Sequence, residues 1–121
     1  MRRLSIIDES SIADLRSGFD IAMIAAHDIF GPFAFRKRDA SDPARRLPIN
    51  KALFETVAVN LATGRHRTGV LVARRDEVDR RVAELLRDPG FDAAITQSTG
   101  TPKRVRHRFT AIDDIFDQVA K

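Results

Sequence analysis

Two clusters of basic residues are the features of this sequence best suited to bind a charged partner. The first lies near the C-terminus, where two threonines precede four cations: Thr99, Thr101, Lys103, Arg104, Arg106 and Arg108. We expect Thr101 to cap a helix that has Pro102 in its first turn. Free amides at such a helix start, together with hydroxyl and guanidinium groups, can hold a phosphate. Alternatively, the arginines pair with acidic residues of other helices, such as Asp14, Asp20 or Asp28.

The charges of this closing helix oppose its dipole. Cations fill its first turns, whereas Asp113, Asp114 and Asp117 lie toward its C-terminus. Each exposed terminal charge of the unfavourable sign costs about 0.3–1 kcal/mol at low ionic strength. Such a conflict requires a compensating interaction, either inside the fold or with a ligand.

A second basic cluster lies in the connector formed by residues 32–49 and comprises Arg36, Lys37, Arg38, Arg45 and Arg46. The connector has no sustained periodicity, and its polar stretch with an Asp-Pro step predicts an exposed loop, with Phe33 and Phe35 on the core. Its cations suit a phosphate backbone or an acidic protein surface, in contacts that are sensitive to salt and independent of sequence. The alternative is a solvated loop without a binding role.

The sequence offers little that could support catalysis. It contains no cysteine, no glycine-rich phosphate loop and no nucleophile elbow. His27 precedes Asp28, but adjacent residues on a helix point about 100° apart, and no further metal ligands accompany them. His66 and His107 lie among arginines, which disfavour both metal binding and a charged imidazole. We therefore expect a chain that is not an enzyme and that binds no cofactor and no metal.

The framework that positions these residues is predicted to be helical. Its most apolar helix runs from about residue 50 to residue 62, with Asn50 as the N-cap. Only a narrow polar edge interrupts its apolar surface: Glu55, Thr56, Asn60 and Thr63. A helix that is apolar around most of its circumference is buried on several sides. We expect it to be the central helix, with Ala58 and Val59 among its apolar positions.

Apolar residues at helical spacing predict the surrounding helices. The predicted spans run from Ser10 or Ser11 to Phe30, from about residue 74 to 87, from 91 to 97, and from Thr101 onward. Gly31 and Pro32 end the first of these helices. The predicted fold is all-α, a small irregular bundle of four main helices plus a short one, in a single domain of residues 1–121.

Two segments fit more than one interpretation. Residues 70–72 suit either a short extended piece or the lead-in to the next helix. Residues 1–9 suit a docking arm, a frayed end or the remnant of a larger domain.

The overall composition narrows the class of protein. The chain has 121 residues, a formal net charge of +4 and no apolar run long enough to cross a membrane. This modest charge permits a phosphate-rich partner without requiring one. Eight phenylalanines fall at core spacings and there is no Tyr or Trp, so the stacking aromatics typical of single-strand binders are missing. We expect a cytoplasmic protein with no membrane partner.

Three stretches carry a resemblance to a known family. The first is residues 30–37, and the third combines residues 91–95, 98–99 and 105–109. The second and most specific is the motif Asn50, Lys51, Ala52, Leu53, Phe54 and Glu55. In this order they resemble the carboxy-terminal helical portion of the domain-of-unknown-function family 262, over most of residues 12–116.

The resemblance implies a context but no reaction. Members of that family resemble ParB and sulfiredoxin-like nucleotide-binding domains and occur in GmrSD-type restriction of modified phage DNA. The family's Asp-Gly-Gln-Arg signature and the His-containing nuclease domain that often follows are both missing from this sequence. No catalytic residue can therefore be assigned by resemblance.

Three functions are consistent with these observations. The first is a helical accessory module that docks on a protein partner or on a second copy of itself. The second is a module that binds nucleic acid, such as DNA, through its arginine clusters. The third is a subunit that completes a nucleotide hydrolase or a nuclease in trans.

Overall fold

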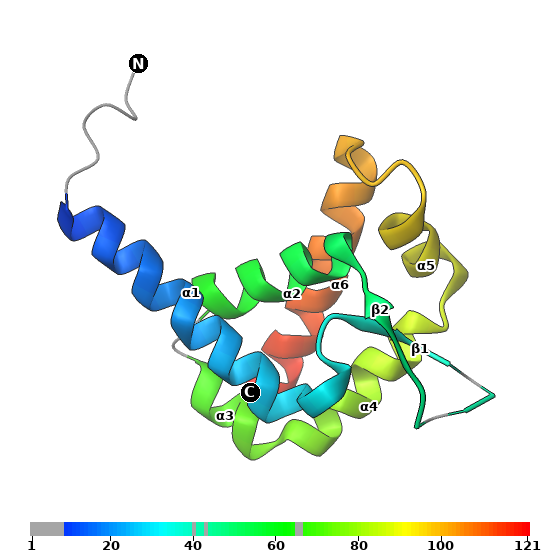
Figure 1. The fold of residues 1–121 in the computed structure, drawn as a ribbon, viewed down its shortest axis with the longest axis horizontal. Coiled ribbons are helices and arrows are strands. Elements are labelled where there is room, and N and C mark those ends of the chain that lie inside the picture. Colours follow the sequence, from blue (N-terminus) through cyan, green and yellow to red (C-terminus); the bar gives the residue numbers. More distant parts are fainter. Residues whose placement is uncertain (1–8, 40, 43, 65–66) are drawn as a thin grey trace.

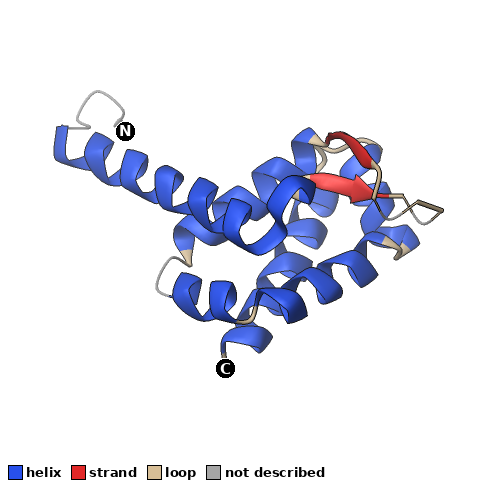
Figure 2. Ribbon diagram, turned by 60° about the horizontal axis from the view of Figure 1, so that its bottom comes forward, coloured by secondary structure: helices blue, strands red, loops and turns tan. Residues whose placement is uncertain are grey.

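The predicted all-α fold is confirmed by a computed structural model, which describes residues 9–39, 41–42, 44–64 and 67–121, with side chains from residue 18 onward. Within these ranges it has six α-helices, a short 3-10 helix and a two-stranded sheet (Figures 1 and 2). The elements are α1 (Glu9–Phe30), η2 (Gly31–Phe33), β1 (Arg36–Arg38), β2 (Arg46–Ile49), α2 (Lys51–Thr63), α3 (Thr68–Ala73), α4 (Arg75–Leu86), α5 (Pro89–Thr96) and α6 (Pro102–Ala120). None of the helices among these residues is long and apolar enough to cross a membrane.

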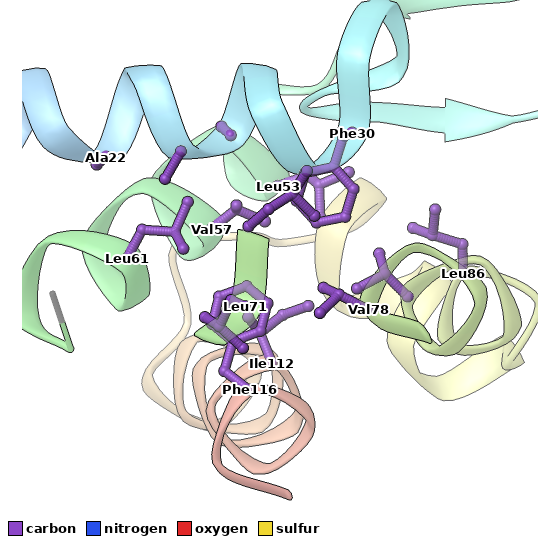
Figure 3. Packing of buried hydrophobic residues seen from close by; sticks show 14 of the residues in the cluster. Ala22, Phe30, Leu53, Val57, Leu61, Leu71, Val78, Leu86, Ile112 and Phe116 are labelled. Carbon is purple, nitrogen blue, oxygen red and sulfur yellow. The ribbon is translucent and has the colours of Figure 1, made fainter. Parts of the chain in front are cut away.

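The core takes buried side chains from all six α-helices. In Figure 3, α1 runs above it and α6 below it, with α2 and α4 on either side. Small residues of α1, such as Ala22 and Ala26, are fully buried, which lets this helix approach α2 closely. Leu61 of α2 and Phe116 of α6 are also fully buried. The central position predicted for the helix at residues 50–62 therefore agrees with its packing against α1 and α6.

Side chains and a glycine set several helix boundaries, and Asn50 and Gly31 do so as predicted. Asn50 Oδ1 accepts from the Leu53 amide at 2.9 Å, which caps α2. Asp88 Oδ2 accepts from the Phe91 amide at 2.9 Å and caps α5. Gly31 follows α1 with a φ of +58°, a left-handed conformation that glycine adopts without strain.

The structure contains one α-helix more than predicted. Residues 68–73, of which 70–72 fitted either a short strand or a helix lead-in, form the separate helix α3. Leu71 anchors it because this side chain is fully buried, whereas Val70 is partly exposed. Six residues are too few to show a periodicity, so the sequence pattern alone could not separate this helix from α4.

The connector also differs from the exposed loop that we expected. Its ends pair as antiparallel strands, with Arg36 opposite Ile49, and the Arg36 guanidinium donates to the Leu47 carbonyl at 2.6 Å. Phe35, with a φ of +63°, packs edge-on against the ring of Phe54 at 4.8 Å between ring centroids. This contact fixes the base of the hairpin on α2. The pairing was not visible in the sequence because both strands are short, three and four residues, and neither shows an alternating apolar pattern.

The polar edge of α2 is not at the surface throughout. Thr56 is fully buried and Asn60 is 6% exposed, whereas Val59 is 45% exposed. Asn60 Nδ2 donates to the Thr56 carbonyl at 2.9 Å and to the Phe109 carbonyl of α6 at 3.4 Å. Two buried polar side chains therefore face α6, and part of the apolar surface of α2 faces solvent instead.

Candidate functional site

Two cations of β1, Lys37 and Arg38, are paired with acidic residues of neighbouring helices. Lys37 Nζ lies 2.6 Å from Asp92 Oδ1 on α5. The Arg38 guanidinium forms an ion pair with both carboxylate oxygens of Asp79 on α4, and it lies 4.9 Å from the centroid of the Phe33 ring. These contacts fasten the hairpin to two helices, so they account for both cations without a ligand.

The remaining hairpin cations leave little charge available. The Arg36 guanidinium donates to the Leu47 carbonyl, and Arg45 Nη1 lies 3.5 Å from Asp39 Oδ2. The hydroxyl and amide of Ser41 donate to Asp39 and lower the pKa of that carboxyl. Among the described residues, only Arg46 of this cluster is exposed and has no acidic partner.

The cations at the start of α6 have a different environment. Lys103 and Arg106 are exposed, Arg104 is half-buried, and none of the three forms an ion pair within the described part of the chain. Thr101 begins the helix, but its side chain caps no amide. Its hydroxyl donates instead to the Ser98 carbonyl at 3.2 Å. We name Lys103, Arg104 and Arg106 the α6 cations.

The acidic half of the same helix is compensated. Arg67, only 8% exposed, lies 2.9 Å from Asp113 and 3.9 Å from Asp117. Arg74 Nη1 donates to the carbonyls of Val119 at 2.9 Å and Lys121 at 3.4 Å, which places a cation at the negative end of the dipole. The charge conflict predicted for this helix is therefore relieved at its C-terminus and not at its N-terminus.

The acidic residues of α1 do not relieve the charge conflict at the start of α6. Asp20 forms no ion pair with a described residue, and Asp28 lies 3.7 Å from His27 on the exposed surface. The side chain of Asp14, like His66, lies outside the described residues. Lys103, Arg104 and Arg106 thus gain no acidic partner from α1 among the described residues.

Beside the α6 cations lies a groove between the starts of α2 and α6. Its volume is about 400 Å³, and it is lined by Lys51, Ala52, Glu55, Thr99, Gly100, Val105, Arg108 and Phe109. We call it the α2–α6 groove. It joins three residues of the motif at 50–55 with the loop at 98–101 and with α6, three segments that are far apart in sequence.

Arg108 forms the floor of the α2–α6 groove and ties its walls together. This residue is 3% exposed; Nε donates to Thr56 Oγ1 at 3.0 Å, and Nη1 donates to the carbonyls of Ala94 at 3.3 Å and Thr99 at 2.6 Å. Its Nη2 lies 3.9 Å from Glu55 Oε2. Arg108, which we predicted as a surface contact together with its neighbours, is mainly a structural link between α2, α5 and α6.

Asn50 fixes the other side of the groove. Besides capping α2, its Nδ2 donates to the Ile95 carbonyl at the end of α5 at 2.9 Å, and its amide donates to the Phe35 carbonyl at 2.9 Å. Asn50 thus joins three elements: its side chain contacts α2 and α5, and its backbone N–H contacts the hairpin. The motif at 50–55 therefore has a structural role at Asn50 and lines the α2–α6 groove through Lys51, Ala52 and Glu55.

The groove as a whole was missed from the sequence, although several of its residues were singled out. Thr56 and Asn60, four residues apart on a largely apolar helix, were the available signal that a polar group must face α2 from inside. The signal for Arg108 was its position four residues before the apolar Ile112, on the same face of the closing helix. Within the described residues, no cluster of three or more His, Asp or Glu side chains could hold a metal ion.

Comparison with known proteins identifies no relative: no family model, curated protein or solved structure matches the chain. The resemblance to the domain-of-unknown-function family 262 therefore stays a prediction. What the α6 cations and the α2–α6 groove can bind must be inferred from their own charges and geometry.

Proposed function

We propose that this protein is a non-catalytic helical binding module whose partner is a nucleic acid. The observation that carries the proposal is that the three α6 cations have no acidic partner among the described residues. Positive charges at a helix N-terminus repel one another and oppose the helix dipole. A phosphate backbone would relieve both effects, because it places anions beside the cations and beside the uncapped amides.

The hairpin supports this choice of surface by contrast. Two of its cations, Lys37 and Arg38, pair with Asp92 and Asp79, which belong to the helices beneath them. A nucleic acid could recruit these two only by breaking those pairs, and Arg46 is the one exposed cation of the hairpin without an acidic partner among the described residues. The proposed interface is therefore the α6 start, with Lys51 and the exposed His107 at its borders.

The family resemblance would give this activity a setting. A DNA-binding accessory module fits a system that restricts modified phage DNA, which is the context that the resemblance implies. In that setting, the chain would supply affinity for DNA, and a partner protein would supply the chemistry.

Titration of duplex and single-stranded DNA at two salt concentrations tests the proposal. We expect binding at low salt. On a duplex, the logarithm of the binding constant should fall linearly with the logarithm of the salt concentration, with a slope of about −0.9 for each phosphate contact. The double variant Lys103→Ala/Arg106→Ala should bind more weakly and reduce the magnitude of that slope by about 0.9 for each contact removed. Arg46→Ala is the matched control, because it removes an exposed, unpaired cation from the hairpin, and it should leave both quantities unchanged.

Two outcomes contradict the proposal. One is the absence of binding to either DNA at low salt. The other is an equal loss of affinity in the Arg46 control and in the α6 variant, since this would mean that net charge alone governs binding.

A second candidate function is docking on a protein through α1. The first half of this helix projects beyond the other helices (Figure 1). Phe19 is 50% exposed, Ile21 38% and Ile24 63%, although Phe19 lies on the same helical stripe as the buried Ala22 and Ala26. A second copy of the chain, or a protein encoded by a neighbouring gene, could cover these side chains.

Light scattering across a concentration series tests self-association, and co-purification with the neighbouring gene products tests the other partner. Ile24→Glu should abolish either association while leaving the fold intact, because this side chain is the most exposed of the three. Val59→Glu is the control, because Val59 is an exposed apolar residue of α2, and it should leave either association unchanged. A chain that stays monomeric and binds no neighbouring product excludes this function.

A further inference from the structure

The α2–α6 groove contains a cationic group with one nitrogen that forms no hydrogen bond to the fold. The Arg108 side chain is 4% exposed, and its Nε and Nη1 donate to protein acceptors, whereas its Nη2 donates to none among the described residues. Nη2 forms only an ion pair with Glu55 Oε2 at 3.9 Å, which is beyond hydrogen-bonding distance. Because both residues line the groove, the unused N–H groups of Arg108 are available to a ligand there.

The first turn of α2 adds further donors to the same groove. Asn50 satisfies the Leu53 amide, whereas the amides of Lys51 and Ala52 donate to no acceptor within the described residues. Both residues line the groove. The first amides of a helix carry the positive end of its dipole and favour an anion.

We propose that the α2–α6 groove binds a single phosphate group, held by Lys51, by Arg108 Nη2 and by the first amides of α2. Lys51 and Arg108 contribute two positive charges and Glu55 one negative charge, so the groove is net positive before the α2 dipole is counted. Its volume of about 400 Å³ admits a phosphate with part of the molecule that carries it. Glu55, which is half-exposed, turns aside when the phosphate binds.

This inference does not depend on binding of a nucleic acid to the α6 cations. Its residues come mainly from α2 and from the buried side of α6, and the α6 cations are not needed to hold the ligand. A failure of DNA binding therefore leaves the phosphate site standing, and the converse also holds.

Titration of the ¹⁵N-labelled protein with inorganic phosphate, at ionic strength held constant with chloride, tests the proposal. We expect saturable shifts of the backbone amide signals of Lys51, Ala52 and Gly100. Lys51→Ala should weaken phosphate binding about tenfold, the effect of losing one charge-assisted hydrogen bond. Because Lys51 is exposed, this variant should keep the wild-type fold, which the dispersion of the same spectrum verifies.

Two further variants separate a built site from general attraction to positive charge. Glu55→Gln should strengthen phosphate binding several-fold, because it removes the carboxylate that competes for Arg108. Arg46→Ala, which removes an exposed cation of the hairpin outside both the groove and the α6 cations, should leave the phosphate affinity unchanged. The proposal is overturned if chloride alone produces the same shifts, or if Lys51→Ala and Arg46→Ala weaken phosphate binding equally.

The source of the phosphate can be read from the same spectra. If a short oligonucleotide shifts the Lys51 and Ala52 amides and competes with inorganic phosphate, the groove takes a backbone or terminal phosphate of a nucleic acid. If the oligonucleotide shifts only residues 103–107, the groove takes a free phosphate compound. Either result supports a phosphate site, whereas oligonucleotide and phosphate that both leave the groove amides unshifted rule it out.

Discussion

The two basic clusters of this protein, one in the hairpin and one at the start of α6, differ in what faces them. The hairpin lies over α4 and α5, which present Asp79 and Asp92 to its cations. The start of α6 presents Lys103, Arg104 and Arg106 with no acid opposite them in the described part of the chain. Clusters of similar composition thus fasten an element in one case and leave charge available in the other.

The difference shows how to recognise a binding surface in a chain with modest net charge. A cation that anchors an element has a partner on a neighbouring element and is partly withdrawn from solvent. A cation that serves a ligand stays unpaired, at some cost in stability when the ligand is absent. The α6 start meets the second description because its charges also oppose the helix dipole.

Within α6, replacement of the buried arginine should have the largest effect. Arg108→Ala leaves the Ala94 and Thr99 carbonyls without their donor and opens a cavity beneath α2. We expect a loss of about 2–4 kcal/mol in the free energy of unfolding, measured with urea. Arg106→Ala, two residues away and exposed, should change stability by less than about 0.5 kcal/mol. Equal effects would mean that the two arginines do not differ in role.

The hairpin should show an intermediate effect. Arg38→Ala removes a half-buried ion pair with Asp79 and a stacking contact with Phe33. We expect it to lower the free energy of unfolding by about 1–2 kcal/mol, the range for a charged hydrogen bond that is partly screened by solvent. The same variant should retain DNA binding. A loss of DNA affinity with unchanged stability would reverse the roles that we assign to the two clusters.

The smallest effect should have the opposite sign. Lys103→Gln removes a positive charge from the first turn of α6, so we expect a gain of about 0.3–1 kcal/mol at low salt. The gain should disappear in high salt, because exposed charges are then screened. Thermal unfolding at two salt concentrations measures the gain at low salt and its loss at high salt. A destabilised variant would show that Lys103 has a partner inside the fold.

The fold was largely predictable because its longer elements carry strong periodic patterns and clear caps. On α6, Ile112, Phe116 and Val119 recur at helical spacing and are buried, and Asn50 and Asp88 cap the helices that follow them. The helix α3 and the hairpin were not predictable, because each is short. Their placement depends on distant partners: the core for Leu71 and Phe54 for Phe35.

The candidate site was predictable in its parts and not in its assembly. The sequence singled out the residues from Thr99 to Arg108 and the motif at 50–55, but it could not show that they share one groove. We predicted Arg108 and Arg106 alike, although only Arg108 lies four residues before Ile112, on the apolar face of α6. The bond from its guanidinium to Thr56 is a property of the packed structure.

Mapping duplex DNA on the protein by amide chemical shifts tests the central claim most directly, because one spectrum reports on both basic clusters. The account predicts shifts of the amides at residues 103–107 of α6, with the amides of the hairpin at 36–38, 46, 47 and 49 unaffected. Shifts confined to the hairpin, with the start of α6 unchanged, would contradict it.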